Sequence, residues 1–214
     1  LLKTTFSVSN MGVSERAVTR ALEDRQRRAA DEVRSLVEAA LTVLRTRGAA
    51  GLTVADVLSE AGLSTRAFYR HFHSKDELVL AVYEHEAQRR HADLEQVIAA
   101  APDPRAALET WIDAMLALGF DPRRARRTRV LRAEGARLQA DFPDEFAAIL
   151  AGAVDPLTSL LRAFPEADPE RDAWSIYEVT WGLVEAKLRG DVIDRTEARA
   201  HVMRFCLPAL GLRP

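Results

Sequence analysis

The segment from Thr53 to Leu78 restricts the fold of this chain more than any other part of the sequence. Apolar residues at helical spacing in 54–61 are followed by Gly62, and Ser64 then opens a second short segment. Gly62 suits a sharp reversal because its backbone reaches positive φ at little cost. Ser64 and Thr53 are residue types that cap helix N-termini. The segment therefore predicts two short helices joined by a glycine turn, which is a helix-turn-helix.

A longer helix is predicted directly after these two. Ser74 and Glu77 have the spacing of a capping box, in which a serine caps the helix and a glutamate three residues later reaches back. The apolar residues behind this box extend the predicted helix to about Ala100. The helix-turn-helix therefore continues into a helix that connects it to the rest of the chain.

The residues before the helix-turn-helix form a polar leader with two interpretations. Residues 1–11 show no helical period and are left out of the fold prediction. Residues 13–32 are polar, with arginines interleaved with acidic residues. They form either a flexible or helical leader, or an arm whose Arg27 and Arg28 reach the minor groove or the backbone of DNA.

Three regions follow from the pattern of apolar residues. From about Ala30 these residues recur at i, i+3, i+4 and i+7, which predicts a helix that ends at Arg47. We therefore assign residues 1–28 to an N-terminal arm and 29–76 to a helix-turn-helix domain. The remainder, 77–214, forms a second helical domain.

Asp-Pro pairs mark helix starts in the second domain. Aspartate caps a helix, and proline fits the first turn because its missing N–H has no partner there. The pattern predicts helix starts near residues 104, 122 and 169, and either a kink or a start at Asp155-Pro156. Asp194 opens a last helix that Pro208 and Gly211 end. Since no strand-like alternation of useful length occurs, the predicted fold is all-α with about nine to ten helices.

The composition excludes several classes of protein. Of 214 residues, 48% are hydrophobic, which is enough for a sizeable core. No apolar run approaches the roughly 18–20 residues that span a bilayer, and no secretory leader is recognisable, so we expect a cytoplasmic protein without a membrane partner. The lone Cys206 cannot form a disulfide within the chain, and its apolar neighbours predict a buried thiol.

The charge of the chain is unevenly distributed. Net charge is −2, yet residues 1–75 carry 12 Lys/Arg against 8 Asp/Glu, so the excess of acid lies in the rest. A basic first third on an acidic body is typical of a DNA-binding unit. Chance variation in surface charge is the alternative, so the charge only supports the motif.

The sequence offers no set of residues for catalysis or metal binding. His85 and His91 lie six residues apart, about 240° around a helix, whereas a zinc-protease helix needs histidines at i and i+4. His71 and His73 lack cysteine or acidic partners at ligand spacing. No glycine-rich phosphate loop and no G-x-S-x-G motif is present. We therefore predict a non-enzyme with no catalytic residue, no metal and no cofactor.

The second helix of the helix-turn-helix, residues 65–71, has one polar and one apolar side. At about 100° per residue, Ala67, Phe68 and Phe72 face the preceding helices. The residues near its N-terminus and outer side would meet base edges in the major groove, and Arg66 or Arg70 could pair bidentately with guanine. The predicted DNA-contacting residues are Thr53, Ser64, Thr65, Arg66, Tyr69, Arg70, His71 and Lys75.

Within this set we distinguish two roles. Thr65, Arg66 and Arg70 are predicted to read bases. Tyr69, His71, Lys75 and the helix start at Thr53 suit phosphate oxygens, which set register without reading sequence. The alternative is a surface helical hairpin with ordinary charges.

These residues resemble a known family. The run Thr53 … Val57 … Ala61-Gly62-Leu63-Ser64 … Phe68-Tyr69 … His71-Phe72 … Ser74-Lys75-Asp76-Glu77-Leu78 is similar to the DNA-binding signature of the tetracycline-repressor (TetR) family of bacterial transcription regulators. The resemblance covers about residues 30–80, and the remaining helices resemble the family only in number, length and order. Two residues depart from it: Leu58, where the family usually has alanine, and Arg66, where many members have a small residue.

The resemblance implies a homodimer built on the last two helices. Apolar residues in 169–189 form two stripes, and a helix that is apolar on two faces needs two neighbours, such as its own domain and a partner subunit. The alternative is that both stripes pack into the subunit's own core. The predicted dimer-interface residues are Trp174, Trp181, Val184, Leu188, Val202 and Phe205.

The resemblance also implies an effector pocket between the middle helices. Apolar residues surround much of the segment from Leu108 to Phe120, so this helix should be central and buried. Tryptophan and methionine are more often core residues than ligand contacts, but the central helix commonly lines the cavity in this family. The predicted ligand contacts are Trp111, Met115, Phe146 and Tyr177, for a small, largely apolar effector with one or two polar groups.

Arginines crowd the segment from Arg123 to Arg137. They point all around a helix, which favours a solvated, exposed helix over a focused anion site. Binding of an acidic effector and contact with DNA phosphates are the alternatives.

Together these features predict a ligand-responsive regulator of transcription, a repressor that binds a palindromic operator as a homodimer and is released by its effector. Its predicted partners are double-stranded DNA, a small molecule and a second copy of the chain. A dimeric helical adaptor or sensor of the same fold without sequence-specific DNA binding is the alternative.

Overall fold

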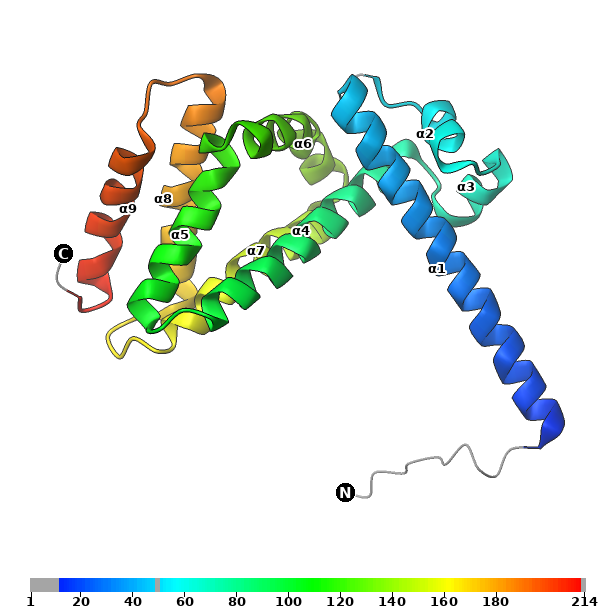
Figure 1. Ribbon diagram of the computed structural model, residues 1–214, viewed down its shortest axis with the longest axis horizontal. Coiled ribbons are helices and arrows are strands. Elements are labelled where there is room, and N and C mark those ends of the chain that lie inside the picture. The colour runs from blue at the N-terminus through cyan, green and yellow to red at the C-terminus, as the bar shows by residue number, and fades with distance from the viewer. Residues whose placement is uncertain (1–11, 49–50, 213–214) are drawn as a thin grey trace.

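The computed structural model describes residues 12–48 and 51–212, so the leader at 1–11 lies outside the described residues. In these ranges the protein consists of nine α-helices and no strand, which confirms the predicted all-α fold (Figure 1). The helices are α1 (Val13–Arg47), α2 (Val54–Ala61), α3 (Thr65–His71), α4 (Lys75–Ala99), α5 (Pro104–Phe120), α6 (Pro122–Asp141), α7 (Pro143–Leu161), α8 (Pro169–Arg189) and α9 (Arg195–Ala209).

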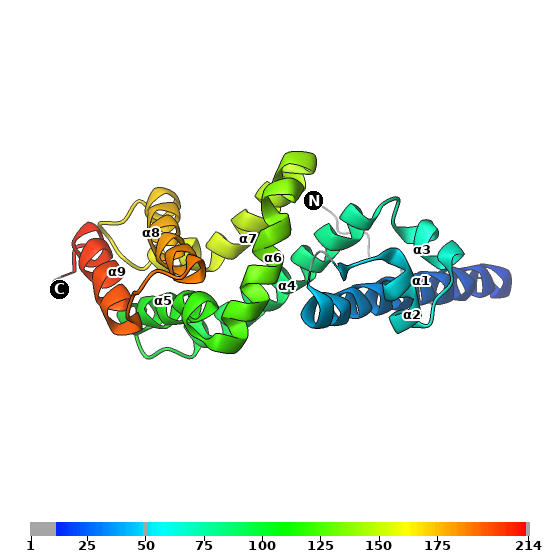
Figure 2. The same ribbon diagram turned by 90° about the horizontal axis from the view of Figure 1, so that it is seen from above.

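Two hydrophobic cores divide the molecule into a head and a body. The head core comes from α1, α2, α3 and the first turns of α4, with fully buried Leu36, Val57, Phe68 and Leu78. The body core comes from the rest of α4 and from α5, α7, α8 and α9. Figure 2 shows the head and the body side by side, with α4 and α6 between them.

The long helix α4 belongs to both cores. Leu78, Val79, Leu80 and Val82 are buried in the head core, whereas Leu94 is buried in the body core. The head core also reaches the body side, because Leu138 of α6 is buried in it. A rotation or shift of α4 therefore moves residues in both cores at once.

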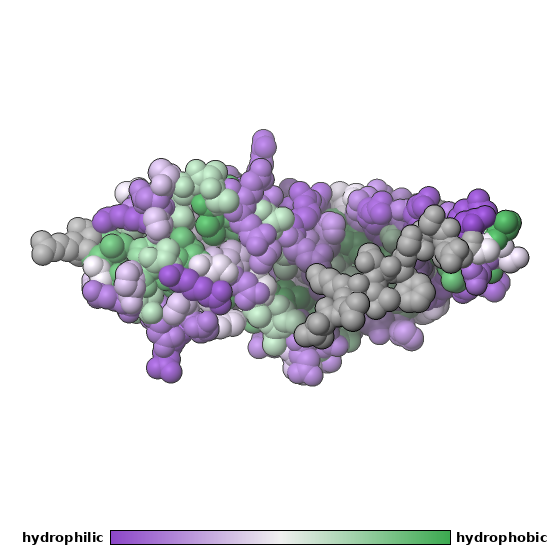
Figure 3. Space-filling model, turned by 90° about the horizontal axis from the view of Figure 1, so that it is seen from below, coloured by the Kyte–Doolittle hydropathy of each residue, from purple (hydrophilic) through white to green (hydrophobic). Residues whose placement is uncertain are grey.

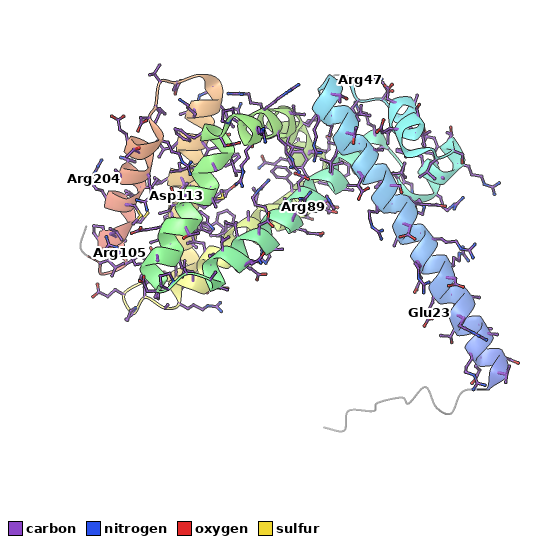
Figure 4. The ribbon with its side chains drawn as sticks, viewed as in Figure 1. Glu23, Arg47, Arg89, Arg105, Asp113 and Arg204 are labelled. Atoms are coloured by element: carbon purple, nitrogen blue, oxygen red, sulfur yellow. The ribbon has the colours of Figure 1, made fainter. Side chains whose placement is uncertain are left out.

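Helix α1 starts much earlier than the sequence predicts. It begins at Val13 instead of near Ala30 and is one continuous helix of 35 residues. Its N-terminal part packs on no other helix of the described residues, and Val13, Val18 and Leu22 remain more than half exposed. In Figure 1 this part projects away from the head, and it carries Glu23, which Figure 4 labels. The leader in 13–32 is therefore helical, and its contact with DNA stays a prediction.

The central helix of the body is α5, as predicted. The side chains of Leu108, Trp111, Ile112 and Leu116 are fully buried, and that of Met115 is almost fully buried. The backbone of α8 comes so close that a Cβ on Gly119 would lie 3.0 Å from the carbonyl oxygen of Val184, and glycine is the residue that allows this approach.

Helix α9 packs against both α5 and α8. Asp113 of α5 accepts a hydrogen bond from Arg199 Nε of α9 at 3.0 Å and lies near Arg195 (Figure 4). Cys206 lies on α9 and is buried, as predicted, and burial raises the pKa of its thiol to about 12.

The predicted helix starts at residues 104, 122 and 169 are confirmed, each with an aspartate cap. Asp155-Pro156 neither starts nor divides a helix, because Pro156 lies inside the continuous helix α7. That helix begins at Pro143, a start the sequence did not predict because Phe142 has no capping side chain. Helix α9 continues one residue beyond Pro208. Within the described residues, no helix is long and apolar enough to cross a membrane.

Candidate functional site

The helix-turn-helix has the caps that the sequence predicts. Thr53 Oγ1 accepts a hydrogen bond from the backbone N–H of Asp56 at 3.1 Å, where α2 starts. Ser64 Oγ accepts one from the N–H of Ala67 at 3.2 Å, where α3 starts. Gly62 has φ 65° and ψ 28°, the left-handed conformation that glycine adopts without steric cost. These local features set the direction in which α3 leaves the turn.

The cap of α4 differs from the predicted box in one bond. Ser74 Oγ accepts a hydrogen bond from the N–H of Glu77 at 3.1 Å, as expected. The Glu77 carboxylate accepts one at 2.6 Å from the N–H of His73 instead of Ser74. This bond holds the pKa of Glu77 below its usual range. Lys75, the first residue of α4, is half-buried at this helix start.

The N-terminal half of α3 presents an exposed polar surface. Thr65 and Arg66 are exposed, and Arg66 has no ion pair or hydrogen bond within the described residues. Tyr69 is 60% exposed, while the adjacent Phe68 is fully buried and packs edge-on against the Tyr69 ring at 5.2 Å. Phe68 thus anchors the helix while its polar neighbours point outward. Their contacts with DNA stay predictions.

Arg70 and His71, predicted to contact a base and a phosphate, face α1 in the structure. Arg70 Nη1 lies 3.1 Å and His71 Nε2 lies 2.7 Å from the same oxygen of Glu32. The His71 side chain is only 10% exposed. Both residues therefore fasten α3 to α1, a role that the sequence did not reveal because Glu32 lies 38 and 39 residues away.

The Glu32 contact predicts a specific dependence on pH. Its hydrogen bond with His71 and the nearby Arg70 charge lower the pKa of Glu32 below the ordinary value of 4.5. A carboxyl with a lowered pKa stabilises the fold above its unfolded pKa and loses this contribution as the pH falls through the folded pKa. The Glu32→Gln variant should therefore unfold at a lower temperature than the wild type at pH 7, and this gap should close below about pH 4.5.

Thermal denaturation from pH 7 to pH 3 measures this gap. Glu38→Gln, which removes an exposed carboxylate from the same helix, is the control and should follow the wild type. A gap between wild type and Glu32→Gln that stays constant down to pH 3 contradicts the assignment.

The arginine run on α6 connects neighbouring helices, in addition to being largely exposed. Arg127 pairs with the buried carboxylate of Glu86 on α4. Arg137 pairs with Asp76 in the first turn of α4 at 2.7 Å. On the other side, Arg132 pairs with Glu185 of α8 at 3.2 Å. Helix α6 therefore connects the start of α4 to α8. The sequence predicted a solvated helix and did not predict these ion pairs between helices.

The residues predicted to contact a ligand lie inside the molecule. Trp111, Met115 and Tyr177 are at most 5% exposed and belong to the body core. Phe146 packs at the head core, 6.0 Å from the ring of Tyr83. Two surface hollows, of about 340 and about 700 Å³, are lined by other residues. Three of the predicted contacts thus belong to the body core and Phe146 belongs to the head core, and their role in binding stays a prediction.

The predicted dimer residues divide into a buried and an outer group. Val184, Leu188 and Val202 are at most 7% exposed and pack into the subunit's own core, so they offer no side-chain surface to a partner. Trp174 and Phe205 are 40% and 54% exposed. Both line the hollow of about 700 Å³ along α8, and Trp181 is half-buried nearby on α8.

Helical geometry explains this division. At 100° per residue, positions 177, 184 and 188 lie within about 40° of one another, whereas 174 and 181 are turned away from 184 by about 60° or more. These apolar positions therefore spread over about 80° of the helix, from the buried Val184 to the exposed Trp174. Figure 3 shows that the hydrophobic surface on the face in view gathers mostly on the body half of the molecule.

The chain is similar in sequence to known regulatory proteins. The family described as "Bacterial regulatory proteins, tetR family" matches residues 36–82. The HTH-type transcriptional regulator BetI of Brucella anthropi is 33% identical over 87 residues, which cover 41% of this chain and 43% of BetI. The HTH-type transcriptional regulator CymR of Pseudomonas putida is 47% identical over 57 residues, or 27% of this chain and 28% of CymR. The chain thus matches less than half the length of these curated relatives.

A solved structure extends the likeness over most of the fold. The reduced form of NemR from E. coli has a TM-score of 0.65 with 20% sequence identity, covering 82% of this chain and 97% of NemR. At this identity the likeness concerns the fold alone.

Proposed function

We propose that the chain is a DNA-binding repressor of transcription that acts in the cytoplasm, because its residues 36–82 match the tetR family of bacterial regulatory proteins. The family is one of regulatory proteins, and the expectation of a non-enzyme agrees with it. The observation that carries the proposal is the exposed N-terminal half of α3, where the polar side chains of Thr65 and Arg66 face solvent next to the buried Phe68.

In this proposal each region has one role. Residues 29–76 bind DNA, and residues 77–214 bind an effector and a second subunit. A homodimer places two α3 helices in successive major grooves, about 34–36 Å apart, so it reads a palindromic operator. An effector that shifts α4 changes this separation and releases the DNA. By linkage, DNA and effector weaken each other's binding by the same factor.

Selection of genomic DNA fragments with the purified chain, at a stated salt concentration, tests sequence-specific binding. Enrichment of a palindromic site is the expected result. Recovery of fragments without a common sequence would reject the repressor and favour a dimeric helical adaptor or sensor without specific DNA binding.

Arg66 and Lys75 should affect DNA binding in different ways. Arg66→Ala should reduce the free energy of binding to the selected operator by about 1–3 kcal/mol and relax the preference at one base pair. A bidentate contact to guanine discriminates against other bases by this amount. Lys75→Ala should weaken binding to all sequences alike and reduce the salt dependence, because a phosphate contact carries no sequence information. Titrations against the operator and against single-base variants at several salt concentrations measure both. The reverse pattern would overturn the two assignments.

The outer face of α8 and α9 supports the proposed dimer. Phe205→Glu places a charge in the exposed apolar patch with Trp174 and should convert the protein to a monomer, because burying an unpaired carboxylate is costly. Sedimentation at micromolar concentration measures the mass. Val192→Glu changes a fully exposed apolar residue between α8 and α9 and should leave the dimer intact. A monomeric wild type, or a Phe205→Glu variant that stays dimeric, contradicts this interface.

A further inference from the structure

Arg90 is a cation without a partner inside the body. It lies on α4 between Glu86 and Leu94, at i−4 and i+4, and both of these residues are buried. Arg90 therefore shares the inner side of the helix. Within the described residues it has neither an ion pair nor a hydrogen bond. Burial lowers the pKa of its guanidinium, and the charge of Arg124 contributes in the same direction.

The nearby acids do not balance this charge. Glu86, one turn before Arg90, is paired with Arg127. Glu185 of α8 is paired with Arg132 of α6 at 3.2 Å. Glu178 of α8 is exposed. The inner side of α4 thus keeps an excess of positive charge, which a folded protein rarely does without a function.

The body core supplies aromatic residues and one free hydrogen-bond donor on this side of α4. Tyr177 of α8 is buried and lies close enough to Arg90 for the two to interact electrostatically. Trp111 of α5 is packed in one core with Tyr177 and Leu94, and its Nε1–H has no acceptor. The region therefore combines a cation, an unpaired donor and apolar side chains.

We propose that the effector is an organic anion with an apolar part, whose carboxylate or phosphate group pairs with Arg90 between α4 and α8. Because Arg90 keeps part of its surface exposed, an anion can reach it from solvent. The apolar part of the ligand lies against the aromatic residues of α5 and α8. This inference rests on the proposed role of the body in binding an effector, and it names the chemical class of that effector.

The free protein tests the unpaired charge. Arg90→Met keeps most of the side-chain volume and removes the charge, so the variant should unfold about 2–4 °C above the wild type. Arg89→Met is the matched control: Arg89, labelled in Figure 4, is exposed on the same helix, and its replacement should leave the midpoint unchanged. A lower midpoint for Arg90→Met than for Arg89→Met would show that the Arg90 cation is already satisfied and would overturn the proposal.

Ligand class is tested with matched probes on the full chain. The anionic probes are hexanoate, 4-phenylbutanoate and hexyl phosphate. For each of them, the controls are a neutral amide or alcohol and an amine that carry the same apolar part. At millimolar concentration, at least one anion should raise the unfolding midpoint of wild type and Arg89→Met by a few degrees and change the tryptophan fluorescence. The shift should disappear in Arg90→Met. A response to the carboxylates or to the phosphate identifies which acidic group is bound.

Three results would overturn the proposal. The first is that neutral or amine probes raise the unfolding midpoint as much as the anions do. The second is that an anion raises the midpoint of Arg90→Met as much as that of the wild type. The third is that none of the anions raises the midpoint. Binding is measured without DNA, so failure of the DNA selection leaves this result unaffected. Equally, absence of an anion preference leaves specific DNA binding to be judged by its own experiment.

Discussion

Phe68→Ala should unfold the head at a temperature at which the wild type is still folded. Phe68 is fully buried, and its ring contacts the rings of Tyr69 and Phe72 at 5.2 and 5.8 Å. Truncation of a buried phenylalanine costs about 3–5 kcal/mol, because apolar contacts are lost and a cavity remains. A three-helix head has a total stability of the same order, so most of the DNA-binding surface should be lost with it.

Chemical denaturation followed by circular dichroism measures this loss. The matched control is Tyr69→Ala, which removes an adjacent ring that is 60% exposed. Tyr69→Ala should change the free energy of unfolding by less than about 1 kcal/mol while it weakens binding to the operator. The reason is that Tyr69 lies on the exposed side of α3, whereas Phe68 lies in the core. If the two variants lose the same stability, the division of α3 into an anchor and an outer side is wrong.

Arg127→Met should be the most damaging single change between the head and the body. It leaves the Glu86 carboxylate, whose side chain is 6% exposed, without its partner on α6. Removal of one member of a buried ion pair costs about 3–5 kcal/mol, and because the Arg127 side chain is 35% exposed we expect about 2–4 kcal/mol. The stability is lost because the buried Glu86 carboxylate remains unpaired, rather than because the attraction within the pair is removed.

A second substitution separates these two causes. In the double variant Glu86→Leu with Arg127→Met no charge is stranded, so most of the lost stability should return. Arg126→Met is the control, since Arg126 is exposed on the same helix and has no ion pair within the described residues. Urea denaturation of all four proteins measures the effect. A double variant as unstable as Arg127→Met would show that packing, and not the charge, is responsible.

The helix-turn-helix was predicted closely because its signals are local. The caps at Thr53 and Ser64 act over three residues, and Gly62 adopts the left-handed conformation that the turn requires. The aspartate caps of α5, α6 and α8 are equally local. Each depends on the immediate neighbours in the chain, so the sequence alone was sufficient.

Predictions failed where no local signal marks the structure. The start of α7 at Pro143 has no capping side chain. The first turns of α1, from Val13 onward, are polar and exposed, so they carry no apolar stripe that packs on a neighbouring helix. Periodicity detects the side of a helix that packs, and it is weak where a helix packs on nothing.

The sequence by itself determined the all-α class, the helix-turn-helix and the polar outer side of α3, because these follow from caps, glycine and spacing within a few turns. Only the tertiary structure decided which polar residues are available. Glu32 pairs with Arg70 and His71, Glu86 pairs with Arg127, and Arg90 has no ion pair among the residues that the structure describes. Likewise, the helices around α8 decide that Val184 is core and Trp174 is surface. Such pairings join residues tens of positions apart, and periodicity along one helix carries no information about which residue of another helix it meets.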